Sequence, residues 1–242
     1  MHQSANELKA LLIKAGLGVD LPVGISEDFA QTALWLQSSE LPGLTWALCA
    51  LRALDDGASS RGFPILADLD KESGSESKRV SAIYLATQLS DAVQVGGLLD
   101  DPGRTLFGID CPELVAAALA LTHRDAGLAF GIEARTKYWS FLSRIHGQGL
   151  YVRAIDESAD RADAVEGALN LSMASEAIFR SIVGSGDVLT DSRGGRPSSG
   201  REGVVAATEE IQALRAFSSR LLVPESDQSL RFGAGAGTRD AD

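Results

Sequence analysis

The sequence contains few of the side chains on which disulfide-stabilised folds and metal sites depend. It has two cysteines among 242 residues, Cys49 and Cys111, each in an apolar helical context, and two such residues do not indicate a disulfide framework. We expect both to be buried as small hydrophobic side chains. The three histidines, His2, His123 and His146, are widely separated, so the sequence predicts no metal site.

Basic residues are also scarce, with 22 Lys and Arg against 33 Asp and Glu, for a formal net charge of −11. Nucleic-acid binding depends on clustered Lys and Arg that displace counterions, so DNA and RNA are not expected as partners. The longest apolar run, Leu114–Leu121, is far shorter than the roughly 20 residues that cross a bilayer, so no membrane insertion is expected. The N-terminus lacks a basic start followed by an apolar stretch, and we expect a cytoplasmic protein.

The chain lacks the common motifs of catalysis and cofactor binding. It contains no Walker loop, no Gly-x-Ser-x-Gly elbow, no His-Glu-x-x-His and no Cys-x-x-Cys, and no cofactor is expected. Two histidines leave alternatives open. His123 is typical of a helix C-terminus, where it would meet the last carbonyls, and His146 is either a general base or an exposed turn residue.

The first half of the chain shows the apolar spacing of helices. Ser4 and Glu7 form a capping-box sequence that predicts a helix start, and Gly16 predicts the end of that helix. A second helix is expected from Ser26. Glu27 and Asp28 would lie in its first turn, where acidic side chains interact favourably with the helix dipole.

The pattern then changes from helical to strand-like. The segment Leu44–Leu54 is apolar nearly all round, which predicts a helix buried between others. Pro112 fits the first turn of a further helix. After it, Leu128, Phe130 and Ile132 alternate with small or polar residues, as in a half-buried strand.

A hairpin is expected next along the chain. Segments 138–145 and 150–155 flank His146-Gly147-Gln148-Gly149, a composition that favours a tight turn, and apolar alternation resumes over residues 165–171. We therefore expect an antiparallel sheet of about four strands, covered by helices on one face. The predicted fold class is α+β, with a helical N-terminal half packed on a small antiparallel sheet, and with a C-terminal helix and tail.

The predicted organisation is one domain in four parts. These are a helical part over residues 1–125, a sheet part over 126–186, a flexible loop over 187–203, and a C-terminal helix and Gly-rich tail over 204–242. The loop is rich in Gly, Ser and Arg and can bury little apolar surface, so we expect proteases to cut it first. Thr208 is expected to cap the last helix.

The tail contains the most unusual stretch, Gly233-Ala234-Gly235-Ala236-Gly237, flanked by Arg231 and Arg239. Alternating glycines let successive backbone amides converge on one anion, so Gly233, Gly235 and Gly237 predict an anion-binding nest that the two arginines would assist. The alternative is a frayed, flexible terminus.

Both ends of the chain resemble a bacterial family of uncharacterised proteins of similar length. The resemblance lies in Asn6-Glu7-Leu8 through Gly24-Ile25-Ser26-Glu27-Asp28-Phe29, and in Val223-Pro224-Glu225-Ser226 through the Gly-Ala-Gly-Ala-Gly tail. Three positions depart from the family pattern: Asp28 replaces a second Glu, Val23 replaces an aromatic residue, and Ser229-Leu230-Arg231 interrupts a Ser-Arg pair. The resemblance implies functional positions at the two ends, an ordered tail, and no particular reaction.

Two functions of different class follow. In the first, the protein is a small-molecule enzyme or enzyme subunit in which Glu27 acts as acid or base and the tail holds an anionic metabolite. In the second, it is a noncatalytic binding or assembly protein whose tail docks on a partner. Whether the protein is an enzyme, and whether it forms a homo-oligomer, stays open at this stage. We also expect the tail to fold back beside Gly24–Glu27, near the start of the second helix.

Overall fold

The structure is a computed structural model. It describes residues 1–66, 69, 78–95, 104–126, 131–137, 139–143, 150–154, 167–174, 190–191 and 203–221, and every structural statement below concerns these residues. Within them, no helix combines the length and the apolar character needed to cross a membrane.

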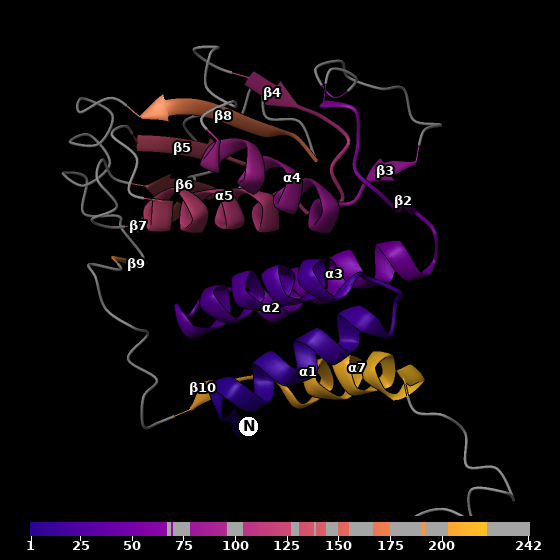
Figure 1. The fold of residues 1–242 in the computed structure, drawn as a ribbon. Coiled ribbons are helices and arrows are strands. Elements are labelled where there is room, and N and C mark those ends of the chain that lie inside the picture. Colours follow the sequence, from indigo (N-terminus) through magenta and orange to yellow (C-terminus); the bar gives the residue numbers. More distant parts are fainter. Residues whose placement is uncertain are drawn as a thin grey trace, which may run out of the picture.

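The elements are stacked in four layers (Figure 1). A β-sheet forms one end of the stack, and three pairs of helices follow it. Moving away from the sheet, the pairs are α4 (Ala82–Gln94) with α5 (Pro112–Ala126), α2 (Val23–Ser38) with α3 (Gly43–Asp55), and α1 (Ala5–Leu17) with α7 (Thr208–Ser218). The predicted α+β class, with helices on a small antiparallel sheet, is confirmed.

The main sheet is antiparallel throughout, in the order β4-β8-β5-β6-β7-β9. Its strands are β4 (Arg104–Leu106), β5 (Gly131–Arg135), β6 (Trp139–Ser143), β7 (Leu150–Ala154), β8 (Leu169–Ala174) and β9 (Thr190–Asp191). A row of buried side chains, Leu171, Ala134, Phe141 and Val152, crosses four adjacent strands in register. Helix α5 packs against β5 and β6, so this row belongs to the core.

The predicted hairpin is confirmed as the antiparallel pair β6–β7, with Trp139 opposite Ala154 and Ser143 opposite Leu150. The glycine-containing turn expected between them lies outside the described residues. The last two residues of the strand expected at Leu128–Ile132 belong to β5, and Leu128 and Phe130 lie outside the described residues.

Two strands of the main sheet occur where sequence patterns did not place them. Strand β4 lies within the part expected to be helical, and it pairs with β8 at one edge of the sheet. Strand β9 lies within the expected flexible loop, and Thr190 pairs with Val152 of β7. The rest of residues 187–202 lies outside the described residues, so rapid proteolysis of that segment stays a prediction.

Two small sheets join distant parts of the chain. Strand β1 (His2–Gln3) pairs antiparallel with β10 (Val204–Val205). Strand β2 (Ser59–Ser60) pairs parallel with β3 (Arg79–Val80), and Val80 forms a parallel bridge with Ile109. Both β3 and the Ile109 segment lead directly into helices, α4 and α5, in the manner of βα units.

Helix α1 begins as predicted, because Ser4 and Glu7 form a complete capping box. The Glu7 amide donates to Ser4 Oγ at 3.2 Å, and the Ser4 amide donates to Glu7 Oε2 at 3.1 Å. The predicted end at Gly16 is wrong, since α1 continues to Leu17 with Gly18 as its cap. Gly16 is instead a contact residue: a Cβ there would lie 2.9 Å from Ser26 Oγ.

Two other predicted helix starts are shifted. Helix α2 begins at Val23, three residues before the predicted start, and the Ser26 amide already donates to the Pro22 carbonyl at 2.9 Å. Ser26 is fully buried, so its side chain packs between helices and does not cap one. Helix α7 begins at Thr208, with Ala207 in the cap position and its amide bonded to Glu210 Oε2 at 3.1 Å.

Helix α3 is the predicted core helix, with Leu44, Ala47, Leu48 and Leu51 buried. The expectation that both cysteines are buried is half wrong. Cys111 is buried, whereas Cys49 is exposed. The reason is that α3 retains one exposed edge, and Cys49 lies on it.

Helix α7 returns to the N-terminal layer from the far end of the chain. It packs against α1, and the Arg220 guanidinium, in the 3₁₀ turn Ser219–Leu221, forms a bidentate ion pair with the Asp55 carboxylate. The Met1 ammonium group donates to the Ala206 carbonyl at 2.6 Å beside β10. The N-terminal layer therefore contains both ends of the described chain.

Candidate functional site

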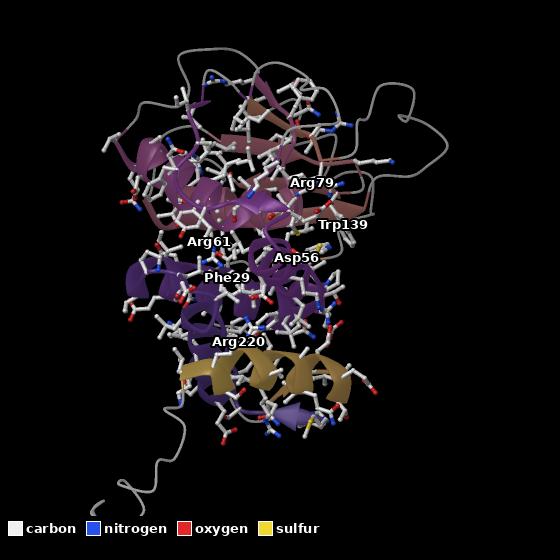
Figure 2. The ribbon with its side chains drawn as sticks, turned by 90° about the vertical axis from the view of Figure 1, so that its right-hand side faces the viewer. Phe29, Asp56, Arg61, Arg79, Trp139 and Arg220 are labelled. Carbon is white, nitrogen blue, oxygen red and sulfur yellow. The ribbon has the colours of Figure 1, made fainter. Side chains whose placement is uncertain are left out.

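A cavity of about 500 Å³ lies between α2, α4 and α5, where the second and third layers meet. Phe29, whose position is labelled in Figure 2, lines it from α2. The wall is formed by one face of each helix: Asp28, Phe29, Gln31 and Thr32 from α2; Ala82, Ile83, Ala86, Thr87, Ser90, Asp91 and Gln94 from α4; and Leu114, Ala118, Leu121 and Thr122 from α5.

Two hydrogen bonds show the relative direction of α4 and α5, the two helices that contribute most of the wall. Near the start of both α4 and α5, Asp110 Oδ1 accepts the Ala82 amide at 2.8 Å. Towards the ends of both helices, Thr122 Oγ1 donates to Ser90 Oγ at 3.0 Å. Helices α4 and α5 therefore run in parallel, and the cavity extends along them.

Small side chains leave this space open. Three of the wall residues are alanines, Ala82, Ala86 and Ala118, at positions where a helix interface normally carries larger apolar groups. Ile83, Leu114 and Leu121 add an apolar wall, while Thr32, Thr87, Ser90 and Thr122 add hydroxyl groups. The lining is thus mixed, as ligand cavities commonly are.

Two carboxylates from different helices line the same cavity, Asp28 on α2 and Asp91 on α4. Partial burial raises the pKa of Asp28, and the negative charges of Asp91 and Glu27 raise it further. No Lys or Arg is among the lining residues that the structure describes. One lining residue contacts an ammonium group: Lys9 Nζ of α1 donates to Gln31 Oε1 at 2.9 Å.

The structure does not bring the sequence-predicted site residues together, because most of them fall outside its described part. Glu27 is exposed on α2 and is not among the residues that line the cavity, although its neighbour Asp28 is. Arg231, Gly233, Gly235, Gly237 and Arg239 lie outside the described residues. Docking of the tail beside Gly24–Glu27 therefore stays a prediction.

Neither of the two histidines that the structure describes lines this cavity. His123 is fully buried in α5, three residues before its end, and His2 lies in β1, while His146 is outside the described residues. Among the described residues, no group of three or more His, Cys, Asp or Glu side chains could hold a metal ion.

A second polar cluster surrounds Asp110, just before α5. Burial is the main cause that raises the pKa of Asp110, and the Ala82 amide, the Ser59 hydroxyl and the Cys111 amide partly oppose that rise. The Ser59 hydroxyl is near the carboxyl group, but it makes no hydrogen bond of good geometry to it. Asp110 Oδ2, Ser59 Oγ and Ser81 Oγ are buried without a hydrogen-bond partner among the described residues.

Cys111 adjoins this cluster. Burial is the largest cause of a pKa well above the usual value for this thiol, and the charges of Glu113, Cys49 and Asp110 add to it. Its Sγ lies 3.9 Å from Glu113 Oε2. The Asp110 cluster therefore orders the starts of two helices, and it contains no activated nucleophile.

Sequence reasoning missed both Asp28 and Asp91 as site residues. A helical-wheel signal for Asp28 was available: Ile25, Phe29, Thr32 and Leu36 form the buried stripe of α2, and Asp28 borders it. Nothing in the sequence places Asp91 opposite Asp28, because that juxtaposition depends on how α2 crosses α4.

Comparison with known proteins supports the resemblance at the N-terminal end. No curated protein and no solved structure matches the chain. One family model matches residues 3–82. The match runs from β1 to the first residue of α4, so it includes Asp28 and excludes Asp91, α5 and α7. That family is described as "protein of unknown function (DUF3726)".

Proposed function

We propose that the protein binds a small molecule in the cavity between α2, α4 and α5. The observation that carries this proposal is a cavity of about 500 Å³ whose lining combines apolar, hydroxyl and carboxyl groups. Small-molecule sites commonly have volumes of roughly 300–1,000 Å³ and a mainly apolar wall with a few polar groups that orient the ligand. Asp28, whose pKa is raised, also suits proton transfer, so an enzyme or an enzyme subunit is one form of this proposal.

The test is to fill the cavity. Ala86 is half-buried on α4 and lines the cavity, so Ala86→Phe should occupy part of it. Ala53→Phe is a matched control, because Ala53 is a half-buried helical alanine on α3 that does not line the cavity. Both variants would be purified under native conditions alongside the wild type, and retained small molecules measured by native mass spectrometry and by ligand-observed NMR with a fragment library.

Binding that is lost in Ala86→Phe and retained in Ala53→Phe supports the proposal. Identical binding in all three proteins places the ligand elsewhere. Absence of any bound fragment in the wild type contradicts the proposal.

The anionic metabolite expected at the tail is a separate proposal. The cavity carries two carboxylates and no basic residue among its described lining residues, so it is poorly suited to an anion. An anion would instead be held by Arg231, Arg239 and the intervening glycine amides. Deletion of residues 232–242 should then abolish stabilisation by added phosphate, as measured by thermal unfolding.

A second candidate function is noncatalytic assembly with a protein partner. Phe63 and Ile65 are exposed large apolar residues, 58% and 70% exposed, close together in sequence after β2. Exposed apolar groups that cluster can mark an interaction surface. Native mass spectrometry distinguishes the two functions, since a stoichiometric protein or a second copy of the chain would favour assembly, and a retained small molecule would favour the cavity.

A further inference from the structure

We propose that the ligand of the α2–α4–α5 cavity carries a protonated amine, held between the carboxylates of Asp28 and Asp91, with an apolar body lying along α4 and α5. This inference rests on the proposed function above and specifies its ligand class.

The charged side chains that line the cavity are negative. Asp28 and Asp91 come from different helices and line one cavity, and neither faces a basic residue among the described lining residues. Glu27 adds a third negative charge that acts on Asp28, and the Lys9 ammonium group is bonded to Gln31. Like charges that act on one another destabilise the fold, and a cation between them converts repulsion into attraction.

The second step concerns the number of hydrogen bonds. A primary ammonium group has three donors and no acceptor, so it needs three acceptors around it. The two carboxylates supply two of these acceptors. Gln94, which lies on the same face of α4 three residues after Asp91, supplies a third through its side-chain carbonyl. Carboxylates form the strongest hydrogen bonds with ammonium groups because both partners are charged.

The third step concerns the body of the ligand. Away from the carboxylates, the cavity is lined by Ile83, Ala86, Leu114 and Ala118. From Ile83 to Asp91 the wall formed by α4 rises roughly 12 Å, at about 1.5 Å per residue. An elongated apolar group attached to the amine would remove this wall from water.

A bare metal ion fits these observations less well than an amine. Two carboxylates are fewer than the six to eight oxygen ligands that Ca²⁺ takes, and Mg²⁺ held by one or two carboxylates keeps a shell of water. The apolar wall would also be left without a contact. The predicted preference is therefore for an organic cation.

The experiment compares three unbranched six-carbon probes, hexylamine, hexanol and hexanoate, with MgCl₂ as a fourth arm. Binding would be measured by isothermal titration calorimetry and NMR to the wild type, Asp28→Asn, Asp91→Asn and Glu209→Gln. Glu209 is exposed on α7, away from the cavity, so its variant matches the change in charge only. Thermal unfolding would verify that each variant is folded.

We expect hexylamine to bind the wild type at least about tenfold more tightly than hexanol, and hexanoate to bind more weakly than either. Each Asp→Asn change should weaken hexylamine by about tenfold or more, leave hexanol unchanged and improve hexanoate, while Glu209→Gln changes nothing.

Three outcomes overturn the inference, and they separate it from the proposed function. If hexanol binds as tightly as hexylamine and the Asn variants behave like the wild type, the cavity binds ligands but selects no cation. If Mg²⁺ at millimolar concentration displaces hexylamine completely, the site binds the metal ion in preference to an amine. If no probe binds and Ala86→Phe behaves like the wild type with every fragment, the cavity is not a ligand site and both proposals fail.

Discussion

At the scale of single residues, Asp110 is the buried acid that links the starts of two helices. Its Oδ1 accepts the Ala82 amide at 2.8 Å, and its pKa is raised mainly by burial. A carboxyl group whose pKa is raised in the fold contributes stability at low pH, and that contribution is lost as pH rises through the folded pKa. The hydrogen bond therefore matters more to the fold than the charge does.

The first prediction separates these two roles. Asp110→Asn keeps an acceptor for the Ala82 amide and removes the buried charge, so it should be at least as stable as the wild type at pH 7. Asp110→Ala leaves that amide unpaired and should lower the free energy of unfolding by about 1–3 kcal/mol. Urea unfolding of both variants checks this, and equal losses in both would show that the charge itself is required.

A second prediction concerns Asp28 and pH. The pKa of Asp28 is raised, so the folded state holds a proton that the unfolded state releases above about pH 3.9. Stability contributed by the protonated form is thus lost as pH rises from there through the folded pKa. Besides burial, the charged groups that raise this pKa are Asp91 on α4 and Glu27 on α2.

Asp28→Asn should therefore unfold at a higher temperature than the wild type at pH 7, with the difference shrinking towards pH 3. Thermal unfolding over this pH range measures it. A difference that does not vary with pH would mean that Asp28 does not titrate abnormally.

The third prediction concerns the two thiols. Cys49 is exposed and Cys111 is buried, so a thiol reagent such as DTNB should modify one cysteine in the folded protein and two after unfolding. Because partial burial and nearby carboxylates raise the pKa of Cys49, its reaction should be slow at pH 7 and accelerate above pH 9. In Cys49→Ser, modification of the folded protein should disappear. Persistent labelling would show that Cys111 is accessible.

At the scale of elements, the contact between α1 and α7 depends on a glycine. A Cβ on Gly18 would lie 2.0 Å from the Phe217 carbonyl oxygen, which no real side chain tolerates. The backbone of Gly18 is in the ordinary right-handed helical region, with φ −67° and ψ −13°. Close approach of the two helices, and not an unusual dihedral angle, therefore requires glycine at this position.

The fourth prediction follows from this contact. Gly18→Ala should lower the free energy of unfolding by about 1–3 kcal/mol, because α7 must move away from α1. Gly24→Ala is the matched control: it lies in α2 with nothing within 4 Å of the added Cβ, and it should be neutral or stabilise by up to about 1 kcal/mol. Chemical denaturation measures both, and a stable Gly18→Ala would show that α7 is not held close to α1.

At the scale of the whole molecule, the segment that matches the family does not contain a complete core. Residues 3–82 include α1, α2 and α3, but α7 covers α1, and α4 and α5 cover α2. Leu8, Leu12 and Leu36 are fully buried in the complete chain. Isolation of the matched segment would expose part of this layered core to water.

The fifth prediction is that a fragment of residues 1–82 does not fold cooperatively by itself. Its circular dichroism should show reduced helicity without a sharp thermal transition, and its amides should exchange rapidly. Addition of a separate peptide of residues 203–221 should at most partly restore structure, because α4 and α5 are still missing. A cooperative transition in the fragment would identify it as an autonomous domain.

Sequence reasoning succeeded where the signal acts within a few residues along the chain. The Ser4–Glu7 capping box and the apolar α3 helix were predictable, because caps and apolar periodicity are local. The β6–β7 hairpin was predictable for the same reason. The start of α2 was not, because Ser26 is a good capping residue that is instead buried against Gly16 of another helix.

The candidate site could not be predicted in the same way. The sequence by itself determined the longer helices, the central strands of the sheet, the net negative charge and the absence of common catalytic motifs, since each depends on composition or on local pattern. Tertiary structure alone decided that Asp28 and Asp91 share a cavity, that Cys49 is exposed, and that α7 closes against α1. These features depend on how helices distant in sequence cross one another, and crossing is set by the packing of many side chains at once.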